Sequence, residues 1–145
     1  MKSVVELEIA APQARVATLL ADPQHAPRWM NDVARYEPLE GTPGMPGSRY
    51  RLVPKKGSRT FVATVLTRDL PTAASVRLEA ANVTVIVKDT FIALSPTATR
   101  LKSEEDFHFT GLLGQLIGFL GRRAIRRAHR RHMLAFKRFA ETPLE

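Results

Sequence analysis

The chain of 145 residues contains no cysteine. This absence excludes disulfide bonds, thiol nucleophiles and thiolate-ligated metal sites. The absence of cysteine also fits a protein of a reducing compartment. The chain also lacks a run of about 20 apolar residues, the length that a helix needs to span a bilayer. Glu6 and Glu8 interrupt the segment that would be apolar in a signal peptide, so we expect a cytoplasmic protein.

Acidic residues and proline are both absent from residues 111–140. This segment opens with apolar residues and glycines and continues with eight cations: Arg122, Arg123, Arg126, Arg127, Arg130, Arg131, Lys137 and Arg138. The whole chain has 22 basic and 14 acidic side chains and a net charge of +8, so the rest of the chain is neutral. We therefore expect any electrostatic partner to meet this one segment.

Most of the remaining chain has the pattern of β-structure. Residues 3–9 alternate between apolar and polar side chains, which predicts a strand with one buried face. A turn rich in glycine and proline occupies residues 41–47. The β-like runs that follow occupy about 48–54, 58–69, 74–81, 82–94 and 98–109.

Helices are expected in two places. Pro12 can begin a short helix over 13–21, and Asp22 followed by Pro23 supplies the N-cap and first residue of a second short helix, which carries Trp29 and Met30. The long helix opens after Thr110. It is the only element long enough to cover the apolar face of an antiparallel sheet of this size.

Four short motifs occur in order along the chain: VELEIAAP at 5–12, DPQHAPRW at 22–29, GSRY at 47–50 and TRL at 99–101. Their order and spacing resemble the START/Bet v 1-like helix-grip superfamily (SRPBCC), in particular its polyketide cyclase/dehydrase and lipid-transport branch. The resemblance implies an α+β helix-grip fold. A curved antiparallel sheet of about seven strands would wrap a long C-terminal helix, with two short helices after the first strand, in one domain over residues 1–145.

In that superfamily the sheet and the long helix enclose an apolar cavity. The resemblance therefore implies binding, and in a carrier transport, of a small hydrophobic or amphipathic ligand, without a cofactor. The expected wall residues are Trp29, Tyr50, Phe91, Leu101, Glu105, Phe107 and Ile117, although large apolar residues also commonly fill a core. The alternative is a cyclase or dehydratase, a lyase or isomerase type of enzyme, acting on a ketide-like substrate. We favour the binding protein.

Glu105 and Asp89 are the candidate catalytic residues. The alternation of the last strand places Glu105 on the same face as Leu101 and Phe107, where a carboxylate is either paired or has a raised pKa. Asp89, in the neighbouring run, lies beside Glu105 on this face unless its side chain points to solvent. For Glu105 the sequence favours a structural pair with an arginine or Tyr50. A carboxylate inside an open cavity would favour the enzyme. A wholly apolar cavity would favour the carrier, and a core filled by side chains would favour an interaction module.

The long helix has an apolar arc opposite its cations, which we expect to pack on the sheet. That arc holds Ala124, Ile125, Ala128, His132, Ala135, Phe136 and Phe139, and extends back to Gly114, Ile117, Gly118 and Gly121. The small residues would let the helix approach the sheet or leave room for a ligand. His129 and His132 have a spacing that could share a metal, but the surrounding arginines argue against a metal site.

The outward arc of the same helix holds apolar residues followed by arginines: Leu112, Leu116, Phe119, Leu120, Arg123, Arg127, Arg130 and Arg131. Three interpretations stay open. In the first, the helix bends at Gly118 or Gly121 and the arginines are solvated. In the second, the arc contacts an anionic membrane, such as the inner membrane face. In the third, the leucines form a homodimer contact and the arginines meet nucleic acid or an acidic protein. We do not expect sequence-specific nucleic-acid binding, because the helix must also cover the sheet.

Overall fold

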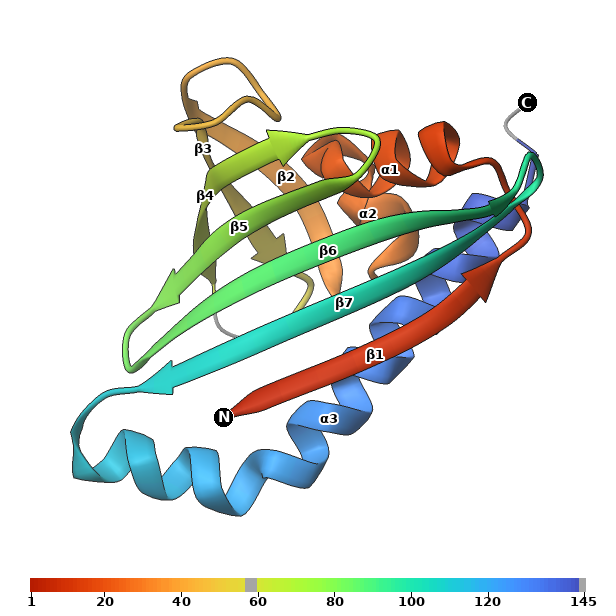
Figure 1. Ribbon diagram of the computed structural model, residues 1–145. Helices are drawn as coiled ribbons and strands as arrows, with labels where there is room; N and C mark the ends of the chain where they lie inside the picture. The colour runs from red at the N-terminus through yellow and green to blue at the C-terminus, as the bar shows by residue number, and fades with distance from the viewer. Residues whose placement is uncertain (57–59, 144–145) are drawn as a thin grey trace.

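The computed structural model describes residues 1–56 and 60–143. Its centre is one antiparallel sheet with the strand order β1-β7-β6-β5-β4-β3-β2 (Figure 1). The strands are β1 (Lys2–Ile9), β2 (Val33–Glu40), β3 (Arg49–Pro54), β4 (Phe61–Asp69), β5 (Ala73–Ala80), β6 (Val83–Ser95) and β7 (Ala98–Phe109). The helices are α1 (Gln13–Ala21), the 3-10 helix η1 (Pro23–His25), α2 (Ala26–Trp29) and α3 (Gly111–Glu141).

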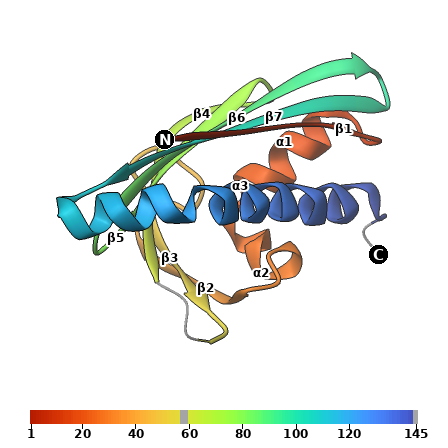
Figure 2. The same cartoon turned by 90° about the horizontal axis from the view of Figure 1, so that it is seen from below.

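This arrangement confirms the expected helix-grip fold. The sheet is curved, α3 runs along it, and α1 and α2 lie beside the C-terminal half of α3 (Figures 1 and 2). The alternation of β1 is also confirmed, since Val5 and Ile9 are buried while Val4, Glu6 and their neighbours on the other face are exposed. Burying that face requires an element on top of it, which α3 provides.

β2 was not predicted as a strand. Its sequence, VARYEPLE, has no clear alternation and contains Pro38, which cannot donate a hydrogen bond to a ladder. β2 lies at the edge of the sheet and pairs with β3 alone, so a missing donor is tolerated there. Its register with β3 shifts on both sides of the segment from Arg35 to Pro38, which weakens the period-two pattern further.

The local signals for the helices are largely confirmed. Asp22 Oδ1 accepts a hydrogen bond from the backbone N–H of Gln24 at 3.0 Å, and Pro23 is the next residue, as its predicted capping role requires. α2 ends at Trp29, so Met30 lies just after it. Thr110 precedes α3 as predicted, but its side chain makes no capping hydrogen bond.

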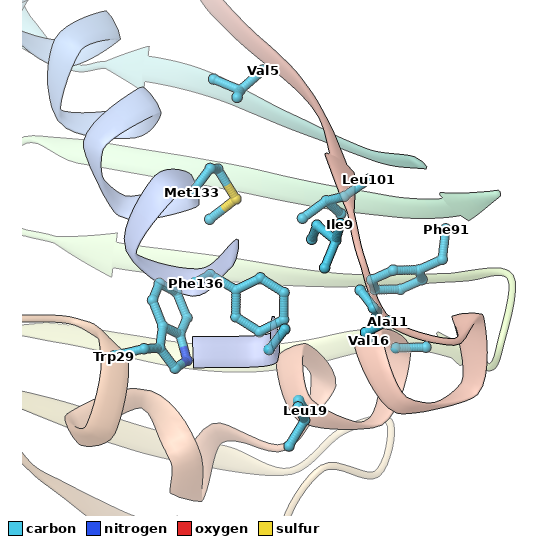
Figure 3. Close-up of a cluster of buried hydrophobic side chains, with 12 residues drawn as sticks. Val5, Ile9, Ala11, Val16, Leu19, Trp29, Phe91, Leu101, Met133 and Phe136 are labelled. Carbon is cyan, nitrogen blue, oxygen red and sulfur yellow. The ribbon is translucent and has the colours of Figure 1, made fainter. Parts of the chain in front are cut away.

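The main hydrophobic core lies between the β1, β6 and β7 end of the sheet, α1, α2 and the C-terminal half of α3 (Figure 3). Phe136 of α3 is fully buried and meets the Trp29 ring edge-on, with ring centroids 5.3 Å apart. Phe91 and Leu101, which face each other across β6 and β7, close the opposite side of this cluster. Aromatic pairs of this geometry add to the free energy gained by burial.

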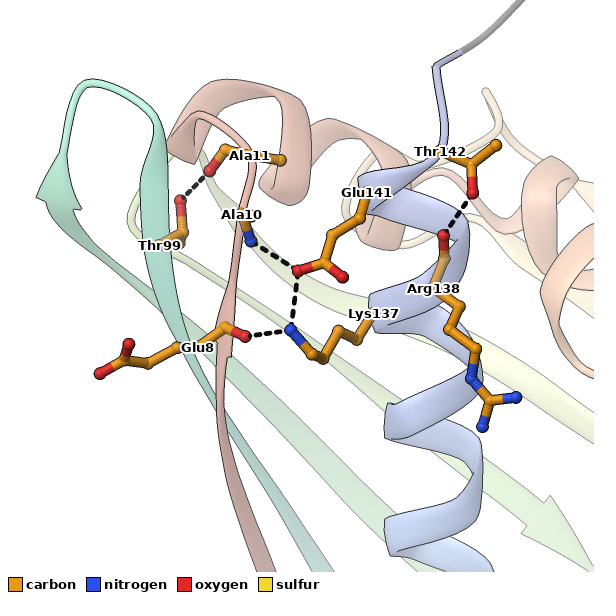
Figure 4. Close-up of polar contacts among 8 residues, drawn as sticks. All are labelled: Glu8, Ala10, Ala11, Thr99, Lys137, Arg138, Glu141 and Thr142. Atoms are coloured by element: carbon orange, nitrogen blue, oxygen red, sulfur yellow. Dashed lines mark hydrogen bonds and ion pairs between the residues drawn. The ribbon is translucent and has the colours of Figure 1, made fainter.

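Polar contacts fix the C-terminal end of α3 to β1 (Figure 4). Lys137 Nζ donates to the carbonyl of Glu8 at 2.8 Å and to Glu141 Oε2 at 2.7 Å. The same carboxylate accepts from the backbone N–H of Ala10 at 2.8 Å. These bonds satisfy backbone groups at the end of β1, where the ladder with β7 stops.

The face of α3 that meets the sheet matches the predicted arc only in part. The buried residues are Gly114, Gly118, His129, Met133, Phe136 and Ala140. Gly114, Gly118 and Phe136 were predicted on this face, whereas His129, Met133 and Ala140 were not. Ala124, which was predicted there, is exposed. The predicted arc did not include His129. This histidine can be buried because the hydroxyls of Ser3 and Ser103 contact its two ring nitrogens.

Glycines at two positions of the inward face allow α3 to approach the sheet closely. A Cβ atom at Gly118 would lie 2.6 Å from Cε2 of Phe109, and one at Gly114 would lie 3.3 Å from the carbonyl oxygen of Asn82. The small residues of the arc therefore serve close packing at these two sites. Gly121 differs, because nothing lies within 4 Å of a Cβ atom built there.

Alanine substitutions at Gly118 and Gly121 should therefore have opposite effects. Gly121→Ala should raise the free energy of unfolding by up to about 1 kcal/mol, because alanine favours helix and meets no neighbour. Gly118→Ala gains the same propensity but displaces the Phe109 ring, and we expect a net loss of about 1–2 kcal/mol. Urea denaturation of both variants measures the difference. Equal stabilisation by both would contradict the packing described here.

Candidate functional site

Two adjoining cavities lie between the concave face of the sheet, α2 and α3. The first has a volume of about 130 Å³ and includes Trp29, Tyr50, Val65 and Asp89 in its walls. The second has a volume of about 350 Å³ and is bounded by residues such as Phe107 of β7 and Ile125 of α3. Both cavities are lined by Met30, Leu52, Leu78, Glu105 and His132. The two cavities therefore adjoin and share a largely apolar wall.

The structure divides the predicted wall residues into three groups. Trp29, Tyr50, Glu105 and Phe107 line the cavities. Phe91 and Leu101 are each 1% exposed and fill the core beyond the cavity, because that end of the sheet is covered by α1.

Ile117 was expected at the cavity but lies away from it, with 42% of its surface exposed. It belongs to the N-terminal third of α3, where glycines occupy the inward positions. The first turns of α3 also extend past the N-terminal end of β1 in Figures 1 and 2.

Both candidate carboxylates face the cavity. In the ladder between β6 and β7, Asp89 pairs with Ser103 and Val87 pairs with Glu105. Paired residues of an antiparallel ladder point to the same face, as do residues two apart on one strand. Asp89 and Glu105 are therefore diagonal neighbours on the concave face. The only register shift of this ladder lies beyond Ala93, so it leaves their orientation intact.

Burial makes the ionised form of each carboxylate unfavourable. It raises the pKa of Asp89 to about 6, against a lowering effect of a hydrogen bond from Ser103. Burial also raises the pKa of Glu105 to about 7, and the charge of Asp89 adds to that shift. Asp89 Oδ1 is buried and has no hydrogen-bond partner among the residues that the structure describes. That oxygen is therefore an unsatisfied hydrogen-bond acceptor.

Glu105 does not have the partner expected from the sequence. Within residues 1–56 and 60–143, neither an arginine nor Tyr50 forms an ion pair or hydrogen bond with it. Its nearest charged or titratable partner is His129, whose Nδ1 lies 3.7 Å from Glu105 Oε1. The Glu105 side chain remains 19% exposed and lines the cavity.

His129 connects α3 to β1 and β7 through a buried polar network. Its Nδ1 lies 2.8 Å from the Ser3 hydroxyl of β1, and its Nε2 lies 3.0 Å from the Ser103 hydroxyl of β7. Burial, and secondarily the charge of His132, lower the pKa of His129 to about 4, so the ring is neutral near pH 7. A neutral imidazole has one donor and one acceptor, so the two serines must play opposite roles toward it.

The ionisation state of Asp89 sets the direction of this network. When Asp89 is ionised, Ser103 donates its hydroxyl proton to the carboxylate and accepts the proton of His129 Nε2. Nδ1 is then the acceptor of the Ser3 hydroxyl. The sequence analysis missed this network. A usable signal was present, because Ser3 and Ser103 occupy inward positions of β1 and β7 beside apolar side chains such as Val5 and Leu101.

With this geometry in place, the sequence can be compared with known families. Residues 1–141 match the family of polyketide cyclase/dehydrase and lipid transport proteins. The chain belongs to this family. No curated protein matches the sequence.

Solved structures similar to this family member share its fold at low sequence identity. TTHA0849 from Thermus thermophilus is 14% identical, with a TM-score of 0.75 over 97% of each chain. A START superfamily protein from Mycobacterium smegmatis is 18% identical, with a TM-score of 0.66 over 92% of this chain and 98% of the other. The ZhuI aromatase/cyclase from a Streptomyces species is 17% identical, with a TM-score of 0.69 over 96% and 95%. The family and these structures fit a ligand-binding helix-grip fold.

Two further titratable groups of this polyketide cyclase/dehydrase family member border the cavity. Tyr50 is buried, and burial together with Tyr36 and Asp89 raises its pKa, so it stays a neutral phenol. At the rim, His132 Nε2 lies 3.5 Å from Asp32 Oδ1, and burial lowers the His132 pKa. Among the described residues, no three histidines or carboxylates are grouped so that they could hold a metal ion.

Proposed function

We propose that the chain binds a small, mostly hydrophobic molecule that presents a hydrogen-bond donor to Asp89. The observation that carries this proposal is the unpartnered Oδ1 atom of Asp89, a residue of a largely apolar cavity wall. A buried polar atom without a partner costs about 1–3 kcal/mol, and a ligand hydroxyl or amine would recover it. The apolar walls supply affinity by burial, and the carboxylate supplies orientation.

A second candidate function is acid–base conversion of the bound molecule. With pKa values of about 6 and about 7, Asp89 and Glu105 can exist near neutral pH as one base and one acid. The base would take a proton from the carbon next to a carbonyl, and the acid would protonate a departing hydroxyl, which leaves as water. Such a removal of one proton and one hydroxyl, as water, suits a cyclase or dehydratase of a ketide-like substrate. The carboxylates inside the cavity are the observation that favours it.

The binding proposal is tested by mass spectrometry of small molecules released from natively purified protein. We expect a small apolar molecule in stoichiometric amount from the wild type, and loss of most of it from Asp89→Leu, which removes both acceptor oxygens. Glu104→Leu is the matched control, because Glu104 lies on the outer face of the neighbouring strand. Equal yields from all three proteins would place the molecule outside this cavity.

A pair of probe molecules tests the role of the donor directly. 2-Naphthol and its methyl ether have nearly the same shape, but only the naphthol can donate a hydrogen bond. We expect the naphthol to bind wild-type protein about tenfold more tightly, since one buried hydrogen bond contributes about 1.4 kcal/mol. The preference should disappear in Asp89→Leu. A preference that survives this substitution would contradict the assignment of Asp89.

A further inference from the structure

The N-terminal third of α3 carries a row of apolar side chains that nothing in the described chain covers. Leu112 is 89% exposed and Leu120 is 71% exposed, and Leu113, Leu116 and Phe119 are also largely exposed. Figure 1 shows that α3 changes direction along its length, but the bend leaves these residues in solvent. Large exposed apolar patches of this kind mark sites of contact with another surface.

The arginines of α3 continue the same face of the helix. Residues three and four apart lie above one another on a helix, so Leu112, Leu116, Phe119 and Leu120 are in line with Arg123, Arg127, Arg130 and Arg131. We call these eight residues the outer face of α3. The inward residues, His129 and Met133 among them, lie on the opposite side. Docking of the outer face would leave the contact between α3 and the sheet undisturbed.

The charge of the outer face is not neutralised by the residues that the structure describes. Arg123, Arg127, Arg130 and Arg131 are exposed, and within residues 1–56 and 60–143 no carboxylate forms an ion pair with any of them. Neighbouring Arg122 lies over the Phe119 ring, with 4.4 Å between its guanidinium carbon and the ring centroid. The outer face of α3 is therefore apolar at its N-terminal end and strongly cationic over the following turns.

We propose that the outer face of α3 docks this protein on an anionic lipid surface. The leucines and Phe119 enter the boundary between headgroups and acyl chains, and the arginines meet the lipid phosphates. No helix in the described part of the chain is long and apolar enough to cross a membrane, so this contact is peripheral. The proposal does not depend on what the cavity binds.

Other occupants fit the outer face less well. A second copy of the chain docked through the leucines would bring two rows of arginines near each other, which costs electrostatic free energy. A nucleic acid would match the arginines, but its phosphate backbone offers no surface for four exposed apolar side chains. An anionic lipid surface is complementary to both ends of the row.

Cosedimentation with lipid vesicles tests the proposal. We expect the wild type to bind vesicles of mixed phosphatidylcholine and phosphatidylglycerol and to bind pure phosphatidylcholine far more weakly. Each arginine near an anionic surface raises binding about fivefold, so Arg123→Gln/Arg127→Gln/Arg130→Gln should weaken binding about a hundredfold. Leu116→Gln/Leu120→Gln should weaken it at least tenfold. Both variants should keep the wild-type melting temperature, because these side chains lie outside the core.

Matched controls separate this face from general charge and apolar effects. Arg35→Gln/Arg49→Gln/Arg100→Gln removes the same charge from exposed positions of the sheet, and Ile92→Gln/Leu94→Gln removes exposed apolar side chains of β6. Both should bind the mixed vesicles within about threefold of the wild type. Equal weakening by the α3 and sheet triples would overturn the proposal.

Three other outcomes would also overturn the proposal. The first is failure of the wild type to bind the mixed vesicles. The second is a wild-type dimer, seen by analytical ultracentrifugation, that Leu116→Gln/Leu120→Gln dissociates while no vesicles are bound, which would assign the face to a second copy. The third is tighter binding to a DNA duplex than to the mixed vesicles at the same salt concentration, which would assign the arginines to nucleic acid.

Discussion

Asp89→Asn and Glu105→Gln should each stabilise the protein near pH 8 and leave its stability near pH 4 almost unchanged. The folded pKa values, about 6 and about 7, lie above the ordinary values of 3.8 and 4.5. The stability that each neutral carboxyl contributes is therefore complete below about pH 4 and is lost as the pH rises through the folded pKa. At 1.36 kcal/mol per pKa unit, we expect a gain of about 2–3 kcal/mol per substitution near pH 8.

Urea denaturation at both pH values measures this effect. Glu104→Gln is the control, because Glu104 is on the outer face of β7 and should change little at either pH. His129 responds in the opposite direction, since its pKa of about 4 lies below the ordinary 6.5 and its contribution is lost on acidification. Comparing each variant with the wild type at one pH cancels that contribution. A gain of equal size at both pH values would contradict the charge explanation.

The same substitutions separate the two candidate functions. If the cavity converts its ligand by acid–base chemistry, Glu105→Gln should reduce turnover at least a hundredfold while the protein becomes more stable. If the cavity only binds, Glu105→Gln should retain ligand within a few-fold, because Asp89 still accepts the ligand donor. A variant that loses stability near pH 8 would instead show that Glu105 is held by a partner, as the sequence suggested.

His129→Ala should be the most destabilising single substitution described here. His129 is 1% exposed and uses both ring nitrogens, so its removal leaves a cavity and deprives the buried Ser3 hydroxyl of its partner. Large-to-small changes with loss of a buried hydrogen bond cost about 3–5 kcal/mol. Chemical denaturation near pH 7 measures the loss. His132→Ala is the control and should cost less than about 1 kcal/mol, because His132 is half-buried and lies at the cavity rim.

A double-mutant cycle distinguishes the hydrogen bonds from packing. Ser3→Ala and His129→Leu each remove one side of the 2.8 Å contact between β1 and α3. If that contact is a real hydrogen bond, the double variant should be more stable than the sum of the single losses predicts, by at least about 1 kcal/mol. Strict additivity, or equal losses in His129→Ala and His132→Ala, would contradict the inward placement of His129.

Much of the fold could be read from local patterns in the sequence. The alternation of residues 3–9 and 98–109 predicted two strands and the faces they bury, including the inward position of Glu105. The pairing of Asp22 and Pro23 predicted the start of η1. β2 was not predicted in this way, because an edge strand with a proline and two register shifts has no clear alternation of apolar and polar residues.

The candidate site was only partly predictable. Trp29, Tyr50, Glu105 and Phe107 were expected at the cavity and line it, whereas Phe91 and Leu101 fill the core and Ile117 is exposed. Aromatic and aliphatic side chains look alike in a sequence whether they border a cavity or close a core. Their separation depends on which part of the sheet α1 and α3 cover, and no local pattern encodes it.

By itself, the sequence determined the strands that alternate, the length of α3 and the concentration of positive charge on that helix, because each is a local or compositional property. Only the tertiary structure decided that His129 is part of the inward side of α3. His129 is buried because Ser3 and Ser103, 126 and 26 residues away, meet its two nitrogens. The free energy of burying a polar side chain is set by such distant partners, and these come together only when the chain folds.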